Sequence, residues 1–196
     1  SYMGYETAEK EVSLKDRAEL EISLVQSSVM AGEVIVESVR AGNRSPLAYS
    51  TISGEQLSKL NTGADIPFIL SLTPSLIETS EAGNGTGYTS LRIRGTDASR
   101  INVTLDGVPL NDPESQSVFW VDLPDLAASV DNIQVQRGVG TSSNGAGAFG
   151  GTVSMQTRSI DYEPFARAAA SAGSFGTVKY SMAAGTGLLA DRFALQ

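Results

Sequence analysis

The clearest alternation of hydrophobic and polar positions lies between residues 91 and 110. Ile101–Leu105 alternates apolar with polar side chains, the period of a strand that buries one face. Asp106–Gly107 predicts a two-residue hairpin turn, because glycine adopts positive φ without steric cost. Pro109 has no N–H to donate, so we expect the returning arm to be short or to lie at a sheet edge. Leu91 and Ile93 indicate another strand just upstream.

Further strand patterns occur on both sides of this stretch. Two strands are expected within residues 1–28, and one more in the apolar run Val34–Val36. Downstream, Ile133, Val135 and Arg137 form one strand pattern and Thr152–Thr157 forms another. Residues 165–171 and 177–182, separated by a turn, alternate in the way of a membrane β-strand with one face toward lipid and one toward a lumen.

Two short helices are predicted between the strand patterns. Ser53 and Gln56 have the spacing of a capping box, and the turn Asn61–Gly63 ends that helix. Asp65 is placed to cap the second helix, which has Pro67 in its first turn. Residues 78–88 and 108–120 have no periodicity of this kind and are expected to be loops.

Composition narrows the possible chemistry. The formal net charge is −8, and a chain without a basic run does not suit binding to a nucleic-acid phosphate backbone. Neither Cys nor His is present, which removes thiolate chemistry and the commonest general base and metal ligand. Any enzyme would depend on carboxylates or hydroxyls, and we expect no catalytic residue, metal site or cofactor.

Four short motifs occur in a characteristic order, at Ile93–Gly95, Leu105–Pro109, Gln134–Gly138 and Asn144–Gly151. They are an Ile-Arg-Gly element, an Asp-Gly-Val-Pro strand end, a Val-x-Arg-Gly element and a glycine-rich segment. Each motif is weak alone, whereas the four together are specific. In this order they resemble the plug domain of TonB-dependent outer-membrane transporters.

The resemblance implies an α+β plug domain, with a mixed β-sheet and short helices, at residues 46–158. Residues 1–30 resemble the tail of a carboxypeptidase-regulatory-like β-sandwich, which precedes the plug in Bacteroidetes-type members. Residues 31–45 would hold a TonB-box-like segment and linker, and residues 159–196 the first, truncated strands of a transmembrane β-barrel. The protein's own barrel would continue beyond residue 196.

The resemblance also implies partners and a location. Glu33, Val34, Ile35 and Val36 match the TonB box, an extended peptide that adds as a strand to periplasmic TonB; a short buried strand is the alternative interpretation. Arg94 and Arg137 match two plug arginines that pair with barrel glutamates. The plug would sit inside a barrel in the bacterial outer membrane, among lipid, with its N-terminus in the periplasm.

The implied function is TonB-dependent active import of a nutrient, with this chain as the gate. The imported compound could be a small molecule, a glycan or a peptide, and a surface lipoprotein is a further partner class. Substrate would meet the outer loops, at side chains that are polar or aromatic. These are Tyr88, Asn111, Asp112, Glu114, Gln116 and Trp120.

Two other function classes remain open at this level. A soluble extracellular ligand- or carbohydrate-binding β module would use the loops around Tyr88 and Trp120. A hydrolase would use two of the carboxylates Asp106, Asp112 and Glu114 as acid and base. The pattern Gly-x-Gly-x-x-Gly that ends at Gly150 does not indicate a dinucleotide site, because a strand rather than a helix is expected after it. We attribute its small residues to close backbone approach to a surrounding wall.

Overall fold

The computed structural model describes residues 23, 40–41, 47–139, 148–189 and 193–196. The elements of these residues are β1 (Tyr49–Ser53), α1 (Gly54–Leu60), α2 (Ile66–Ile69), β2 (Leu76–Ser80), β3 (Thr89–Ile93), η2 (Ala98–Arg100), β4 (Ile101–Leu105), β5 (Val108–Pro109), η3 (Trp120–Asp122), η4 (Leu126–Ala128), β6 (Val130–Arg137), β7 (Gly151–Thr157), β8 (Pro164–Ala172), η6 (Ser174–Gly176) and β9 (Val178–Thr186). The strands expected within residues 1–28 and at Val34–Val36 lie outside the described residues.

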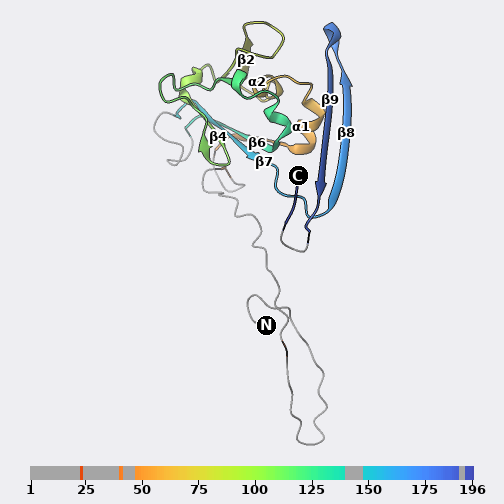
Figure 1. Cartoon of the computed structure of the whole chain (residues 1–196). Helices are drawn as coiled ribbons and strands as arrows, with labels where there is room; N and C mark the ends of the chain where they lie inside the picture. Colours follow the sequence, from red (N-terminus) through yellow and green to blue (C-terminus); the bar gives the residue numbers. More distant parts are fainter. Residues whose placement is uncertain (1–22, 24–39, 42–46, 140–147, 190–192) are drawn as a thin grey trace, which may run out of the picture. The chain divides into compact units, whose positions relative to one another are not determined.

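The central element is a five-stranded mixed sheet in the order β1-β6-β7-β4-β5 (Figure 1). β4 and β7 run parallel, and the other neighbours are antiparallel. Asp106 and Gly107 both have positive φ, at 49° and 82°, as the predicted turn requires. Pro109 ends the two-residue β5 at the sheet edge, which confirms that part of the prediction. A mixed sheet with short helices is the expected plug architecture.

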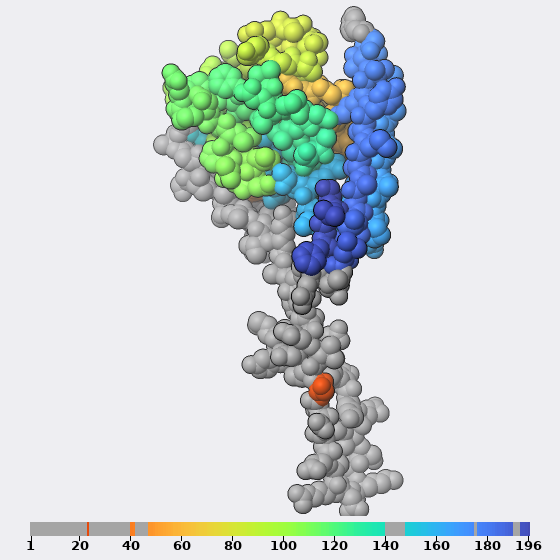
Figure 2. Space-filling view, in the orientation of Figure 1, coloured from red at the N-terminus to blue at the C-terminus, as the bar shows by residue number. Residues whose placement is uncertain are grey.

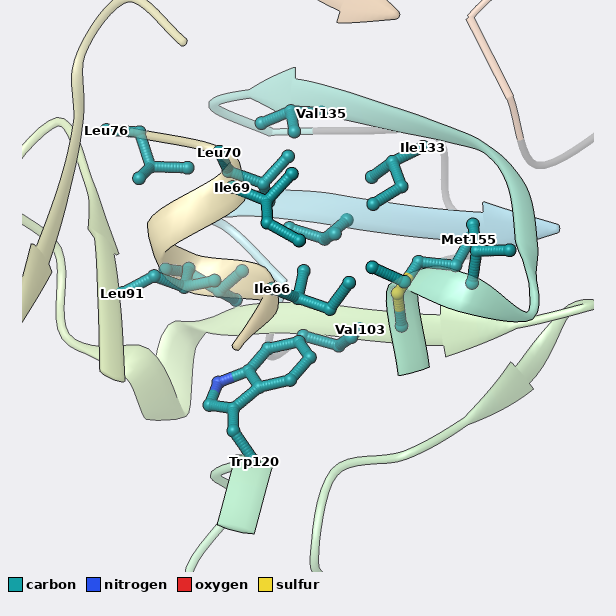
Figure 3. Packing of buried hydrophobic residues seen from close by; sticks show 14 of the residues in the cluster. Ile66, Ile69, Leu70, Leu76, Leu91, Val103, Trp120, Ile133, Val135 and Met155 are labelled. Atoms are coloured by element: carbon teal, nitrogen blue, oxygen red, sulfur yellow. The ribbon is translucent and has the colours of Figure 1, made fainter. Parts of the chain in front are cut away.

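The hydrophobic core lies on one face of this sheet, under the two helices. Alternation along β7, and along β6 after the bulge between Val130 and Asn132, sends apolar side chains to the core and polar ones to the other face. Ile133 is opposite Met155, and Val135 is opposite Val153, and all four side chains are inaccessible to solvent. All four belong to one cluster with Ile66, Ile69 and Leu70 of the helical segment. Figure 3 shows Ile133, Val135 and Met155 in this packing.

The first helix begins and ends as its sequence predicts, whereas the second differs. Ser53 and Gln56 form a complete capping box for α1, and Leu57 is fully buried. Asp65 precedes α2 but does not cap it, because its carboxylate accepts a hydrogen bond from Thr89 Oγ1 at 2.8 Å. α2 is a single turn, held by the burial of Ile66 and Ile69.

Two strands were not predicted, and part of one loop prediction is wrong. Residues 78–80 belong to β2, which pairs antiparallel with β3 in a separate two-stranded sheet. β1 pairs along its full length with β6, more than 70 residues away in the chain. Neither segment has strong alternation of its own, so each is a strand because of its partner. In the described part of the chain no helix has the length and apolar character needed to cross a membrane.

Gly150 and Gly151 allow close backbone approach, as was predicted for the glycine-rich segment, and the backbone that they approach belongs to this same chain. Approach of the segment to a surrounding wall stays a prediction. A Cβ on Gly150 would lie 2.9 Å from the carbonyl oxygen of Arg100. A Cβ on Gly151 would lie 2.7 Å from the carbonyl oxygen of Gln136. Both glycines therefore allow close approach of segments within the same sheet, so that β7 can enter between β4 and β6.

Candidate functional site

Arg94 and Arg137 lie at one corner of the molecule. Arg94 directly follows β3, with φ at 52°, and its backbone N–H donates to the carbonyl oxygen of Ser75 at 2.8 Å. Arg137 ends β6, and its Nη1 donates to the carbonyl oxygen of Pro74 at 3.4 Å. Pro74 is the residue directly before Ser75. Arg94 Nη1 also lies 3.0 Å from the position that a Cβ on Gly138 would take. The turn at Pro74 and Ser75 thus bonds the backbone of Arg94 and the side chain of Arg137, and the Arg94 side chain lies beside Gly138, the residue after Arg137.

Neither Arg94 nor Arg137 forms an ion pair within the described part of the chain. The ion pairs found there are Lys59–Glu55, Arg167–Asp161 and Lys179–Asp125, none of which includes Arg94 or Arg137. Arg94 is exposed, and Arg137 is half-buried with its Nε lacking a hydrogen-bond partner among described residues. Desolvated guanidinium groups favour carboxylate partners. Pairing of both arginines with barrel glutamates stays a prediction.

Asn111 holds the base of the loop that was predicted to face substrate. Its Oδ1 accepts from the backbone N–H of Val103 at 2.8 Å, and its Nδ2 donates to the carbonyl oxygens of Ile101 and Gln116 at 2.9 and 2.8 Å. The Asn111 amide thereby bonds backbone groups of β4 that a neighbouring strand would otherwise bond, and it also joins the two ends of the loop. These bonds use the donor and acceptor capacity of the side chain for structure.

Asp112 builds the tip of the same loop. Its Oδ1 accepts from the backbone N–H groups of Glu114 and Ser115 at 3.0 and 2.7 Å. The hydrogen bond from Ser115 is the main cause that lowers the pKa of the Asp112 carboxyl below its ordinary value. The turn exposes the side chains of Glu114 and Gln116, and Tyr88 is 64% exposed. Gln116 Nε2 donates to the carbonyl oxygen of Pro113 at 2.9 Å, so its amide is partly used within the loop. Contact of these three exposed side chains with substrate stays a prediction.

Trp120 is not a substrate-facing residue, which corrects the sequence prediction. Its side chain is only 3% exposed and belongs to the hydrophobic core. Figure 3 shows the indole ring directed toward Val103 and Ile66. A large aromatic at the first position of η3 anchors the loop by apolar burial. The Trp120 side chain is therefore not accessible to a carbohydrate, whereas Tyr88 is exposed.

The carboxylates considered for hydrolysis are largely engaged in turns. Asp106 accepts from the backbone N–H and hydroxyl of Thr157 at 2.9 and 2.7 Å, and thus ties the β4–β5 turn to the end of β7. Asp112 is held by its own loop, as described, and Glu114 is exposed. Within the described ranges, no group of three or more acidic side chains could hold a metal ion.

The hairpin β8–β9 contacts the plug through Lys179, a residue that the sequence did not single out. Its ammonium group donates to Asp125 Oδ1 at 2.6 Å and to Asn61 Oδ1 at 2.8 Å, and Asn61 Nδ2 donates to Asp125 Oδ1 at 2.9 Å. A cavity of about 450 Å³ lies beside this contact, lined in part by Arg158 and Ser181. The available signal was the alternation of residues 177–182, which places Lys179 on the same face of its strand as Thr177 and Ser181.

The two faces of the hairpin differ sharply in polarity. Directly opposed residues share a face, so the pairing of Ser171 with Lys179 places both on the side of the plug. Val178, Tyr180 and Met182 lie on the other side and are 62%, 78% and 89% exposed. The other residues on that side are apolar except for the last threonine: Pro164, Ala166, Ala168, Ala170, Ala172, Ala184 and Thr186. The hairpin forms a continuous blue surface in Figure 2.

A family model described as the TonB-dependent Receptor Plug Domain matches residues 42–152, more than half of the chain. A curated relative, the probable TonB-dependent siderophore receptor PirA of Acinetobacter baumannii, is 28% identical over 127 residues. That alignment covers 60% of this chain and 17% of the relative, so the chain spans only a small part of the relative's length.

Solved structures of larger receptors contain the same fold. The ferric yersiniabactin uptake receptor FyuA of Yersinia pestis matches with a TM-score of 0.56 and 15% identity, over 74% of this chain and 22% of that chain. FpvA of P. aeruginosa, bound to a pyoverdine–iron complex, matches with a TM-score of 0.59 and 17% identity, over 73% and 18%. The match to the plug family model, together with this shared fold, identifies the chain as a member of the TonB-dependent receptor plug domain family.

Proposed function

We propose that this chain is the gate of a transporter that imports a nutrient across the bacterial outer membrane with energy delivered by TonB. Residues 159–196 would begin the barrel around it, and the N-terminal segment would lie in the periplasm. The observation that carries this proposal is the hairpin β8–β9, which binds the plug through Lys179 and presents an apolar outer face. That division suits a wall between a plugged lumen and lipid.

Gating would depend on three surfaces of the chain. Glu33, Val34, Ile35 and Val36 would add as a strand to TonB, through main-chain hydrogen bonds. Arg94 and Arg137 would pair with barrel carboxylates, because neither guanidinium group forms an ion pair within the described part of the chain. Tyr88, Glu114 and Gln116 would meet substrate at the outer loops, where their side chains are exposed. A surface lipoprotein would be a further partner on that side.

Iron-loaded siderophores are the substrate class that we propose first. Support comes from the relatives, since PirA is named as a siderophore receptor and FyuA as a ferric yersiniabactin uptake receptor. The short alignments leave out the greater part of those proteins, so the class rests on their names and not on a described binding site.

The test is growth of a host that lacks its own outer-membrane iron receptors. The host carries the parent protein, and matched strains with and without TonB receive a panel of iron-loaded catecholate and hydroxamate siderophores. We expect at least one compound to support growth only when both proteins are present. Growth that is independent of TonB would overturn the proposal. Retention of the TonB C-terminal domain by the purified parent protein, with no compound transported, would overturn the siderophore class alone.

A further inference from the structure

The side chain of Gln134 in β6 forms two hydrogen bonds with the backbone of Ala41. Gln134 Oε1 accepts from the N–H of Ala41 at 2.7 Å, and Gln134 Nε2 donates to the carbonyl oxygen of Ala41 at 3.0 Å. Ala41 and Gln134 are only 5% and 6% exposed. The carboxamide therefore serves both polar groups of one peptide residue, as a neighbouring strand would. This contact joins positions 93 residues apart in the sequence.

A second contact fixes the residue next to it. The Arg40 guanidinium donates to Gln156 Oε1 in β7, and also to the carbonyl oxygen of Ser154 at 3.4 Å. Asn132 Nδ2 donates to the same oxygen of Gln156 at 2.9 Å, which holds that amide in place. Burial lowers the pKa of the Arg40 guanidinium, a sign that the contact is partly withdrawn from water.

Gln134 and Gln156 both belong to the polar face of the sheet, opposite the hydrophobic core. Gln134 is directly opposite Ser154, and Gln136 is opposite Thr152, across β6 and β7. Gln136 Nε2 donates to Gln134 Oε1 at 3.1 Å, which directs the opposite end of the Gln134 amide, its N–H group, toward the carbonyl oxygen of Ala41. A polar sheet face that is buried instead of solvated needs such partners, because unpaired buried polar groups are costly.

The position of Arg40 and Ala41 in the chain gives this contact its meaning. They follow closely on Glu33–Val36, the segment proposed to bind TonB, and they precede β1, which pairs with β6 through five residue pairs. A pull directed from the N-terminal side therefore loads Arg40 and Ala41 before it loads β1. We propose that Gln134 and Gln156 are positioning residues that transmit this pull to the central strands β6 and β7. The proposal rests on the TonB-dependent function proposed above.

The bonds that Gln134 and Gln156 make to Ala41 and Arg40, here called the anchor, can transmit a pull because breaking them costs free energy. Detachment of Ala41 breaks two buried hydrogen bonds of the Gln134 carboxamide, whose Oε1 then keeps only the bond from Gln136 Nε2. A buried polar group that loses its partner costs about 1–3 kcal/mol in comparable cases. The anchor is bonded to the two strands that also carry the core residues Ile133 and Met155 on their other face. Displacement of Arg40 and Ala41 would therefore disturb the β6 and β7 strands to which they are bonded.

The experiment uses the full-length parent protein with Gln134→Met and Gln156→Met, which keep side-chain length but remove the amide. Thr152→Val is the matched control, because Thr152 lies on the same buried face and its hydroxyl has no partner among described residues. Hydrogen exchange at the Ala41 amide is measured first. We expect exchange to accelerate about tenfold to a hundredfold in Gln134→Met, as expected from loss of a buried hydrogen bond, and to stay unchanged in Thr152→Val.

Uptake is measured next, with the iron-loaded siderophore that supports growth in the panel. Each glutamine variant is expected to lose at least tenfold in uptake rate, while siderophore binding and retention of the TonB C-terminal domain stay at the wild-type level. Wild-type uptake in both variants would overturn the proposal, as would parallel loss of TonB or siderophore binding. Unchanged hydrogen exchange at Ala41 in Gln134→Met would refute the anchor, whether or not a siderophore is transported. The exchange measurement thus separates failure of this inference from failure of the proposed import function.

Discussion

The ammonium group of Lys179 in β9 lies 2.6 Å from the Asp125 carboxylate, which belongs to the turn that leads into η4. Asp125 adopts a left-handed backbone conformation, with φ at 51°, and this places its carboxylate beside Asn61 and Lys179. The contact joins the hairpin to the plug through side chains that come from three separate segments of the chain.

Loss of this contact should loosen the hairpin measurably. Lys179→Met is expected to lower the free energy of unfolding by about 1 kcal/mol, since the Lys179 side chain is only 16% exposed and makes two bonds. Lys59→Met is the control, because the Lys59–Glu55 pair is 71% and 80% exposed and such pairs contribute less than about 0.5 kcal/mol. Thermal unfolding and hydrogen exchange of β9 provide the measurement. Equal effects of the two variants would contradict the assignment.

The correction for Trp120 gives a second prediction. Trp120→Ala should destabilise the plug by about 3–5 kcal/mol, the usual cost of removing a buried aromatic side chain. Tyr88→Ala should change stability by less than about 0.5 kcal/mol, because Tyr88 is exposed. Denaturant unfolding followed by circular dichroism compares the two. A stable Trp120→Ala protein with weakened substrate binding would restore the original prediction.

Asn111 should matter for the order of its loop more than for ligand contact. Asn111→Ala removes three hydrogen bonds to the backbone, so we expect a loss of about 1–3 kcal/mol. Faster hydrogen exchange at the Val103 amide would locate the change. Glu114→Ala is the stability control in the same loop, since only the backbone of Glu114 is bonded there. Unchanged protection of Val103 in Asn111→Ala would refute this role.

The Asp112 turn should depend on pH. Its folded-state pKa is lowered by the hydrogen bond from Ser115, so it lies below the unfolded value of about 3.9. The turn is therefore stabilised at pH above about 4, and this stabilisation is lost as the pH falls through the folded pKa. Exchange of the Ser115 amide should approach that of Asp112→Ala in acid and differ from it at neutral pH. Identical exchange at neutral pH would rule out the turn.

The sequence predicted those parts of the fold that depend on local chemistry. The Asp106–Gly107 turn and the Ser53 capping box are formed by neighbouring residues, and both are present in the structure. β1 and β2 were missed because their pairing with remote strands makes them strands. The burial of Trp120 could not be predicted for a similar reason, since its loop packs on a core assembled from distant segments.

The candidate site divides in the same way. The motifs identified Arg94 and Arg137, and the structure adds that both reach the turn at Pro74 and Ser75. Lys179 and Gln134 were missed, because their partners lie 54 and 93 residues away in the chain. The alternation of residues predicted which face of its strand each side chain occupies, but it could not predict the partners Asp125 and Ala41.

The proposed gating requires that TonB binds the segment that holds Ile35. Ile35→Pro removes the backbone N–H needed for strand addition, whereas Ile35→Ala keeps it. The decisive measurement is TonB-dependent uptake of the active siderophore by the parent protein carrying each change. We expect Ile35→Pro to abolish uptake while siderophore binding persists, and Ile35→Ala to retain most of it. Wild-type uptake by Ile35→Pro would contradict the account.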